Sequence, residues 1–207
     1  TGAPRLVTGS GRTDTGVHAL GQVASVAVPE RWSAAELRAA LNALLPAEIW
    51  VSEARRAEPR FHPRRDALAR SYEYRLGTER EAASPFFRPW CWNASADPPD
   101  RELLLEASEM IPGERSFGSF AKSGQPDRGE RCRVTEARWR PWTGPGLRFV
   151  ITANRFLHHM VRYLVGTMVE VARGKRPLDE MRVLLDSRGE GFVTSPPAPP
   201  EGLFLTH

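Results

Sequence analysis

The sequence contains few cysteines, few lysines and no long hydrophobic run. Its two cysteines, Cys91 and Cys132, lie far apart and belong to no CxxC or CxxH pattern, which argues against a disulfide framework and a cysteine-based zinc site. The longest apolar segment, 156–172, is interrupted by charged residues and histidines, and it is shorter than the roughly 20 residues that span a bilayer. We therefore expect reduced thiols, a cytoplasmic location and no membrane association.

Lysine is so rare that arginine supplies almost all of the positive charge. Only Lys122 and Lys175 occur among 29 basic residues, which oppose 25 acidic ones to give a net charge of +4. Eight arginines and four acidic residues fall within 55–80, so the excess in this stretch equals that of the whole chain. Guanidinium groups suit phosphate, although an arginine bias also arises from genome composition. The charge permits a nucleic-acid partner without requiring one.

The pattern of apolar residues predicts an α+β fold. The 207 residues, 41% of them hydrophobic, are enough for one large domain or two small ones. The predicted strands, most of them alternating in hydrophobicity, are 22–28, 71–76, 147–152 and 202–206. The predicted helices, the first of which opens with a capping box at Ser33 and Glu36, are 34–45, 100–111, 156–172 and 178–186. Strands followed by helices in both halves indicate two similar-sized units joined near 59–66.

A loop rich in glycine, serine, threonine and aspartate precedes the first predicted strand. Its centre reads Gly11-Arg12-Thr13-Asp14-Thr15-Gly16-Val17-His18. Glycines at both ends allow positive φ and a close approach of the backbone to a ligand. From residue types alone, Asp14 fits either a catalytic carboxylate or a turn-stabilising residue, and His18 fits either a general base or a packing residue. The loop lacks the Gly-Lys-Ser/Thr ending of a Walker loop.

This loop, continued to Ala19, resembles the catalytic motif of the tRNA pseudouridine synthase A family. Further matches follow in the family's order and approximate spacing over almost the whole chain. They are Asn42-Ala43-x-Leu45-Pro46, Phe61-His62 with Arg64, Ala69-Arg70-x-Tyr72-x-Tyr74, Phe117-x-x-Phe120, Phe156-Leu157-x-His159-Met160-Val161-Arg162 with Gly166, and Glu201-Gly202-Leu203. Such an ordered series is far more specific than any single motif.

The resemblance implies a fold and a set of partners. Family members have two similar-sized α/β-sandwich halves, ferredoxin-like or RNP-like, whose antiparallel mixed sheets flank a central RNA-binding cleft. We accordingly expect an N-terminal half over 1–66 and a C-terminal half over 67–207. N-terminal elements of the first half are expected to be missing, because the family has a further strand, helix and strand before this loop. The resemblance also implies a homodimer that binds tRNA, with no metal and no nucleotide cofactor.

The implied activity is the isomerisation of uridine to pseudouridine in the anticodon stem-loop, at tRNA positions 38, 39 and 40. Asp14 matches the catalytic aspartate, which acts either as a nucleophile or as a base. Another tRNA site, a non-catalytic RNA-binding module and a cofactor-free hydrolase of the glycosidase type are the alternatives.

The resemblance assigns roles to further residues. Arg162 matches the basic partner of the aspartate, although an arginine on an apolar helix can also simply extend to solvent. Tyr72 matches the active-site tyrosine that stacks on the detached uracil, whereas Tyr74 on the same strand fits a core position. Substrate binding is also expected of Arg12, which would either fill the space of a flipped nucleotide or contact its phosphate, and of His62 and Arg64.

Three other histidines are expected to be structural or to face RNA. They are His18 and the pair His158-His159. Two adjacent histidines supply two metal ligands, and the sequence shows no credible third one beside them. We therefore expect no metal site there.

Overall fold

The computed structural model describes residues 4–122, 129–186 and 193–207, which fold into two compact units. The first unit comprises Thr1–Arg12 and Val23–Ala67, and the second comprises Thr13–Gln22 and Leu68–His207. The boundary at 67 lies next to the expected division, while the segment that carries Asp14 belongs to the second unit. The division into two domains stays a prediction.

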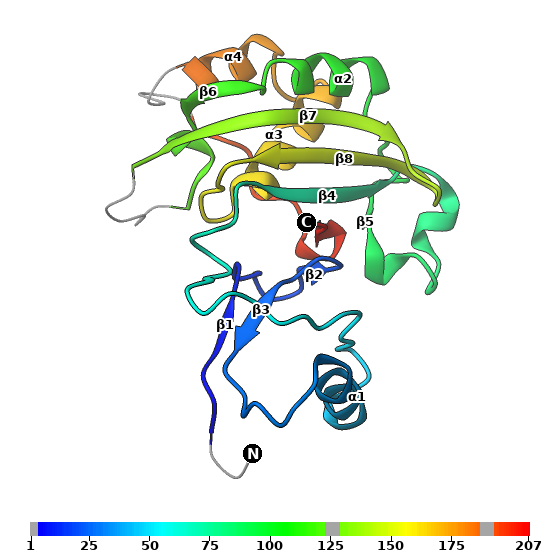
Figure 1. The fold of residues 1–207 in the computed structure, drawn as a ribbon. Coiled ribbons are helices and arrows are strands. Elements are labelled where there is room, and N and C mark those ends of the chain that lie inside the picture. The colour runs from blue at the N-terminus through cyan, green and yellow to red at the C-terminus, as the bar shows by residue number, and fades with distance from the viewer. Residues whose placement is uncertain (1–3, 123–128, 187–192) are drawn as a thin grey trace. The chain divides into compact units, whose positions relative to one another are not determined.

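The second unit is built around a mixed sheet of seven strands (Figure 1). The strand order is β2-β9-β4-β8-β7-β6, with β5 paired to β4 outside this path. The strands are β2 His18–Ala19, β4 Arg70–Gly77, β5 Trp92–Asn93, β6 Gly113–Ser116, β7 Arg131–Pro141, β8 Gly146–Ala153 and β9 Leu203–Leu205. The β2–β9 and β4–β5 pairs are parallel, and the other pairs are antiparallel. Together with the helices, this sheet confirms the predicted α+β class.

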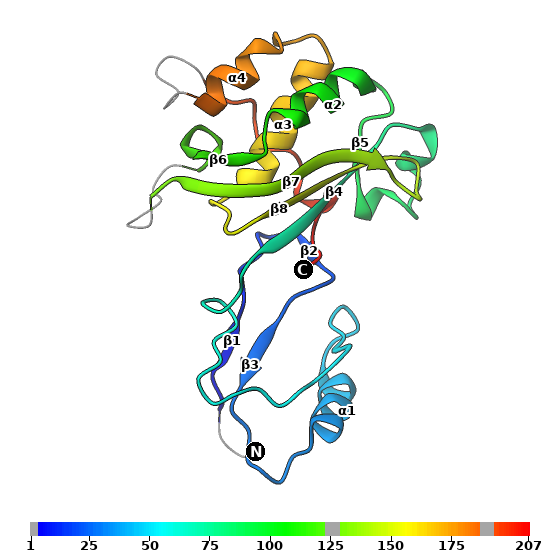
Figure 2. The same ribbon diagram turned by 45° about the horizontal axis from the view of Figure 1, so that its top comes forward.

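Three α-helices cover one face of this sheet (Figure 2). They are α2 Arg101–Glu109, α3 Met160–Ala172 and α4 Asp179–Asp186. The connections contain short 3₁₀ helices at Arg80–Ala83, Arg88–Trp90, Gly118–Phe120 and Pro200–Gly202. The predicted helices over 100–111 and 178–186 are confirmed. The first of them begins at Asp100, whose carboxylate accepts the backbone N–H of Leu103 at 2.9 Å as an N-cap.

The hydrophobic core lies between the sheet and α3. Strand β8 alternates as the sequence predicts, and it turns Leu147, Phe149 and Ile151 inward. On α3, residues such as Leu164 and Met168 are fully buried against this face. Burial of an aliphatic or aromatic side chain contributes about 1.5–3 kcal/mol, so α3 is held by packing along its whole length. No helix in the described ranges has the combined length and apolarity needed to cross a membrane.

Strand β7 is the main element that the sequence analysis missed. Its buried side chains are Cys132 and Val134 before a register shift, and Ala137 and Trp139 after it. The irregularity between Val134 and Glu136 changes which positions face inward. A search for strict period-two alternation therefore finds only two short fragments.

Helix α3 begins later than predicted. The expected helix over 156–172 ends correctly but starts at Met160, because His159 has φ +65° and cannot continue a right-handed helix backwards. Before it, the N–H of Met160 donates to the carbonyl oxygen of Leu157 at 3.1 Å in a turn. The side chains just before Met160 therefore point in directions that a helix starting at residue 156 would not allow.

The first unit contains two strands and one α-helix. Strands β1 Val7–Gly9 and β3 Ala24–Val26 form an antiparallel pair, and the latter lies within the predicted strand 22–28. Helix α1, Ala34–Leu44, starts at the predicted capping box of Ser33 and Glu36. These predictions are confirmed.

Candidate active site

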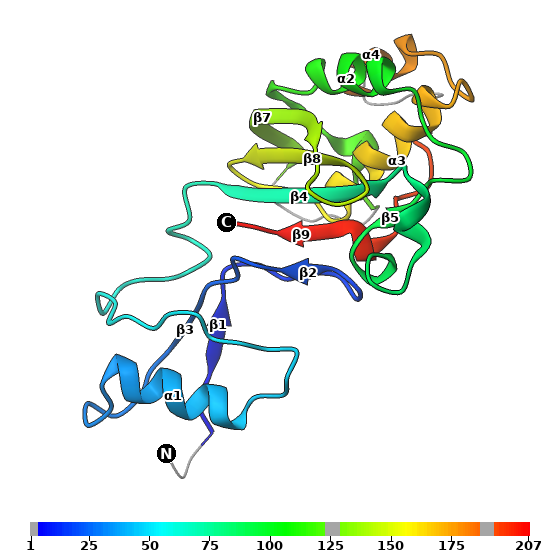
Figure 3. The same ribbon diagram turned by 90° about the vertical axis from the view of Figure 1, so that its right-hand side faces the viewer.

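The loop that carries Asp14 is attached to the C-terminal strand of the second unit. Strand β2 follows the loop and pairs in parallel with β9, as Figure 3 shows. The N–H of Val17 donates to the carbonyl oxygen of Asp14 at 3.0 Å. Gly16 has φ +83°, and a Cβ there would lie 2.9 Å from Cγ of Pro200. Glycine is therefore needed at position 16. Gly11, at the other end of the loop, is not among the described residues with positive φ.

Three basic side chains from the start of α3 surround the Asp14 carboxylate. Nε2 of His158 lies 3.2 Å from Oδ1, and Nε2 of His159 lies 3.1 Å from Oδ2. Nη1 of Arg162 lies 3.6 Å from Oδ2. The positive end of the helix dipole adds to the favourable field on this carboxylate. Asp14 is therefore oriented by groups on both of its oxygens and is still 27% exposed.

The structure places a carboxylate beside the histidine pair, for which the sequence alone showed no credible third ligand. The Asp14 carboxylate and one nitrogen of each histidine lie within 4.8 Å of one another. The sequence analysis missed this cluster because it treated the histidines and the aspartate as separate features. The pairing of β2 with β9 and the packing of α3 bring them together.

His159 has an unusual backbone as well as a carboxylate partner. It is the only non-glycine residue with positive φ in the described ranges, at a cost of roughly 1–2 kcal/mol. Its ring lies against those of His158 and Tyr163, with centroids 4.1 and 6.2 Å away. Burial lowers the pKa of His159 below its ordinary value, against the opposing effect of the nearby Asp14 charge. The imidazole is therefore neutral at pH 7, and it can donate one hydrogen bond to the carboxylate.

Arg162 does not extend to solvent. Its side chain is only 12% exposed, and its Nε donates to the carbonyl oxygen of Ala198 at 2.7 Å. This bond turns the other side of the guanidinium toward Asp14. The alternative of a simple solvent-exposed arginine is wrong for this residue.

The segment that contains Ala198, the hydrogen-bond partner of Arg162, passes very close to α3. A Cβ on Gly166 would lie 2.2 Å from the carbonyl oxygen of Pro196, so only glycine allows this approach. The segment is also anchored by Tyr74, whose hydroxyl donates to the carbonyl oxygen of Pro199 at 2.8 Å. Tyr74 is fully buried, which confirms its expected core position.

Tyr72 is in a different environment from Tyr74. Its ring makes an edge-to-face contact with Phe156, with centroids 5.0 Å apart. Burial raises the pKa of the Tyr72 phenol, and the Asp14 charge adds to that rise while Arg70 opposes it. The hydroxyl is therefore protonated at neutral pH. It can take part in proton transfer only by passing on its own proton, not as a preformed phenolate.

His18 is a packing residue in this structure. Its ring stacks on Phe204 with centroids 4.7 Å apart and lies 4.9 Å from the ring of Trp90. Its Nε2 is 3.1 Å from the carbonyl oxygen of Pro89. These contacts favour the structural alternative over the general base.

The three remaining predicted binding residues belong to the first unit. Arg12 and Arg64 have exposed side chains. Nδ1 of His62 accepts the backbone N–H groups of Arg64 at 3.2 Å and Arg65 at 3.3 Å, and the backbone N–H of His62 donates to the Asp66 carboxylate at 2.7 Å. His62 therefore stabilises a tight turn, and its role in substrate binding stays a prediction.

Part of the arginine-rich stretch 55–80 is neutralised internally. Arg55 pairs with Glu53, and Arg75 pairs with Glu73 at 2.8 Å. Arg75 also lies over the ring of Phe204, 3.8 Å from its centroid. Arg75 is thus held within the fold, whereas Arg55 forms an exposed pair with a carboxylate just outside the stretch.

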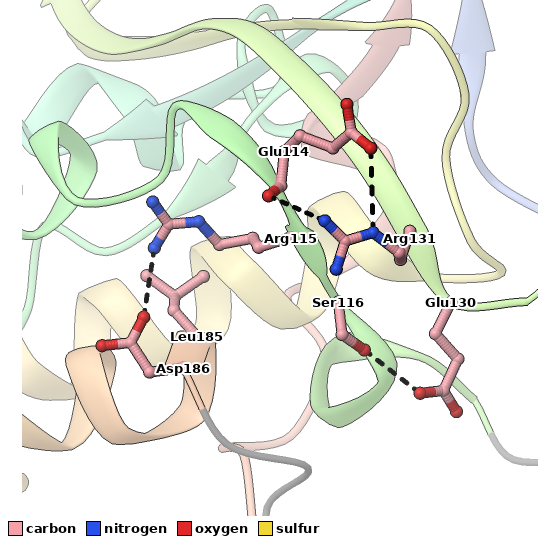
Figure 4. Close-up of a pocket in the computed structure, with 7 residues that line it drawn as sticks. All are labelled: Glu114, Arg115, Ser116, Glu130, Arg131, Leu185 and Asp186. Atoms are coloured by element: carbon pink, nitrogen blue, oxygen red, sulfur yellow. Dashed lines mark hydrogen bonds and ion pairs between the residues drawn. The ribbon is translucent and has the colours of Figure 1, made fainter.

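A pocket of about 550 Å³ lies at a separate place in the second unit, between β6, β7 and α4 (Figure 4). It is lined by Glu114, Arg115, Ser116, Glu130, Arg131, Leu185 and Asp186. Its arginines pair with carboxylates, such as Arg115 with Asp186 at 3.5 Å. The pocket contains none of the predicted site residues.

Comparison with known proteins agrees with the resemblance noted in the sequence. A family profile described as tRNA pseudouridine synthase matches residues 107–207. The chain is 37% identical over 206 residues to the tRNA pseudouridine synthase A of Geobacillus sp. (strain WCH70), covering 96% of this chain and 79% of that protein. The proteins of the same name from Syntrophomonas wolfei and Myxococcus xanthus are 37% and 35% identical, covering 95% and 99% of this chain and 77% and 76% of theirs.

Proposed function

Because the chain belongs to the tRNA pseudouridine synthase A family, we propose that it isomerises uridine to pseudouridine in the anticodon stem-loop of tRNA. The proposal rests on the position of the Asp14 carboxylate beside the start of α3. Arg162 and two histidines contact its oxygens there. Tyr72 belongs to the same compact unit. A positioned carboxylate and an aromatic ring are the two groups that this reaction needs.

The reaction breaks the N1–C1′ bond of uridine and forms a C5–C1′ bond, while C5 loses a proton and N1 gains one. We assign to Asp14 the attack at the sugar, either as a nucleophile on C1′ or as a base that starts elimination. Both routes need an ionised carboxylate with a fixed direction. Arg162 and His159 supply that direction through contacts at 3.6 and 3.1 Å to one oxygen.

Tyr72 is the proposed platform for the detached uracil. Stacking of a base on an aromatic ring contributes about 1–3 kcal/mol, which keeps the free base in place while it rotates. The edge-to-face contact with Phe156 fixes the plane of the tyrosine ring. Its protonated hydroxyl is suited to a proton relay at C5.

Substrate binding is assigned to Arg12, His62 and Arg64 together with the exposed arginines of 55–80. Extrusion of a nucleotide costs a few kcal/mol, which contacts to the RNA backbone must offset. A homodimer would present twice the charge of one chain to the tRNA. The homodimer, the cytoplasmic location and the architecture of two similar sandwich halves are parts of this proposal.

The test is tritium release from tRNA that carries C5-labelled uridine, followed by mapping of pseudouridine. The wild-type protein is expected to release tritium and to modify positions 38, 39 and 40. Asp14→Asn is expected to abolish release while tRNA binding persists. Asp97→Asn is the matched control, since it removes an exposed carboxylate that pairs only with Arg173 among the described residues.

Each other outcome contradicts a defined part of the proposal. Undiminished release by Asp14→Asn excludes Asp14 as the reacting group. Free uracil in place of pseudouridine indicates a hydrolase. Pseudouridine at other positions indicates a different tRNA site, and no turnover by wild type with intact binding indicates a non-catalytic RNA-binding module.

A further inference from the structure

Asp14, His158 and His159 bring three metal-binding groups together from two distant parts of the chain. Their ligand atoms all lie within 4.8 Å of one another. Ligands bound at about 2.0–2.1 Å to one tetrahedral zinc ion lie about 3.3 Å apart. Side-chain movements of roughly 1 Å would therefore let all three groups bind the same ion.

The chemistry of these groups favours a particular class of ion. Two imidazole nitrogens and one carboxylate are a donor set that Zn²⁺ and similar transition ions accept, with water as a fourth ligand. Mg²⁺ prefers oxygen donors and suits this set poorly. His158 is 43% exposed and Asp14 is 27% exposed, so an ion and its water can reach them.

We propose that Asp14, His158 and His159 form an inhibitory site for Zn²⁺ or a chemically similar divalent transition ion. The inhibition rests on the proposed function, because it follows from removing the carboxylate that reacts at the sugar. An Asp14 oxygen that binds a metal cannot attack C1′ or act as a base. The ion and the target nucleotide therefore compete for the same carboxylate.

Arg162 explains why this site inhibits rather than holds a permanent ion. Its Nη1 lies 3.6 Å from Oδ2 of Asp14, and its fixed positive charge repels a dication. The bond from its Nε to Ala198 prevents the guanidinium from moving away freely. Binding is therefore reversible and weaker than at a structural zinc site.

The first experiment measures binding without tRNA. Metal-free protein is titrated with Zn²⁺ by calorimetry, and Co²⁺ serves as a spectroscopic probe of coordination. One ion per chain is expected, and His158→Asn and His159→Asn should each weaken binding at least tenfold. Asparagine tolerates the left-handed backbone at 159, so that variant keeps the fold. His207→Asn is the matched control, because this exposed histidine lies outside the cluster.

The second experiment measures activity in the presence of Zn²⁺. Zinc should inhibit pseudouridine formation by wild type, a chelator should restore it, and His158→Asn should raise the half-inhibiting concentration at least tenfold. Equal zinc binding by wild type and both histidine variants overturns the site. Zinc inhibition that His158→Asn leaves unchanged overturns the inhibitory role. A metal-free protein that binds zinc at the cluster but makes no pseudouridine supports the site and contradicts the proposed function, so the two failures are distinct.

Discussion

Nε of Arg162 donates to the carbonyl oxygen of Ala198 at 2.7 Å, and the N–H of Ala198 donates back to the carbonyl oxygen of Arg162 at 2.9 Å. This reciprocal pair joins α3 to the segment that precedes β9. It leaves Nη1 of Arg162 directed to Asp14. The direction of the guanidinium therefore depends on a backbone carbonyl far away in the sequence.

Arg162→Lys is expected to lower kcat about 100-fold with little change in tRNA binding. A lysine ammonium cannot bond to Ala198 and reach Asp14 at once, because it lacks the planar fork of a guanidinium. A charge-orienting donor in an active site contributes about 10²–10³ in rate. Single-turnover kinetics with saturating enzyme measure this effect directly. A variant with wild-type turnover would show that positive charge alone is sufficient.

Gly166→Ala is expected to destabilise the protein by about 1–3 kcal/mol. The new Cβ would lie 2.2 Å from the carbonyl oxygen of Pro196, so the segment must move away from α3. Since Ala198 lies two residues after Pro196, the same movement should loosen Arg162 and lower kcat. Urea unfolding and turnover measure the two effects. Ala198→Gly keeps the backbone carbonyl and serves as the control, with a much smaller loss of turnover.

Tyr72→Phe is expected to lower kcat by about 10²-fold while KM stays nearly unchanged. Phenylalanine keeps the aromatic face but lacks the hydroxyl for a proton relay. Tyr72→Leu should raise KM as well, because it also loses about 1–3 kcal/mol of stacking. Steady-state kinetics of the two variants separate these contributions. Equal kinetics for Tyr72→Phe and wild type would exclude the hydroxyl from the chemistry.

Acidification is expected to destabilise wild type more than His159→Asn. Burial lowers the pKa of His159 in the folded state, so the unfolded chain binds a proton here first as the pH falls. The contribution of the neutral ring is fully present above about pH 6.5, where both states are neutral. This stabilising contribution is lost as the pH falls from about 6.5 toward the lower pKa of His159 in the folded protein. Urea unfolding at about pH 7.5 and about pH 5 measures the difference, and a larger acid loss in the variant would contradict it.

Local patterns predicted much of the second unit's core. The alternation of Leu147, Phe149 and Ile151 in β8 and the helix predicted over 100–111 depend on neighbours a few residues away, so the local sequence is sufficient. Strand β7 was missed because its register shift near Glu136 depends on pairing with β8. The late start of α3 was missed for a related reason, since no pattern shows that His159 adopts positive φ.

The sequence by itself determined the α+β class, the order of the motifs and the family to which they belong. It also singled out Asp14, Tyr72 and Arg162, because these residues occur within recognisable motifs. Only the tertiary structure decided which groups contact the Asp14 carboxylate and that His158 and His159 are among them. The pairing of β2 with β9 and the packing of α3 on the sheet bring these distant residues together. Such contacts depend on long-range pairing and burial, which local periodicity does not encode.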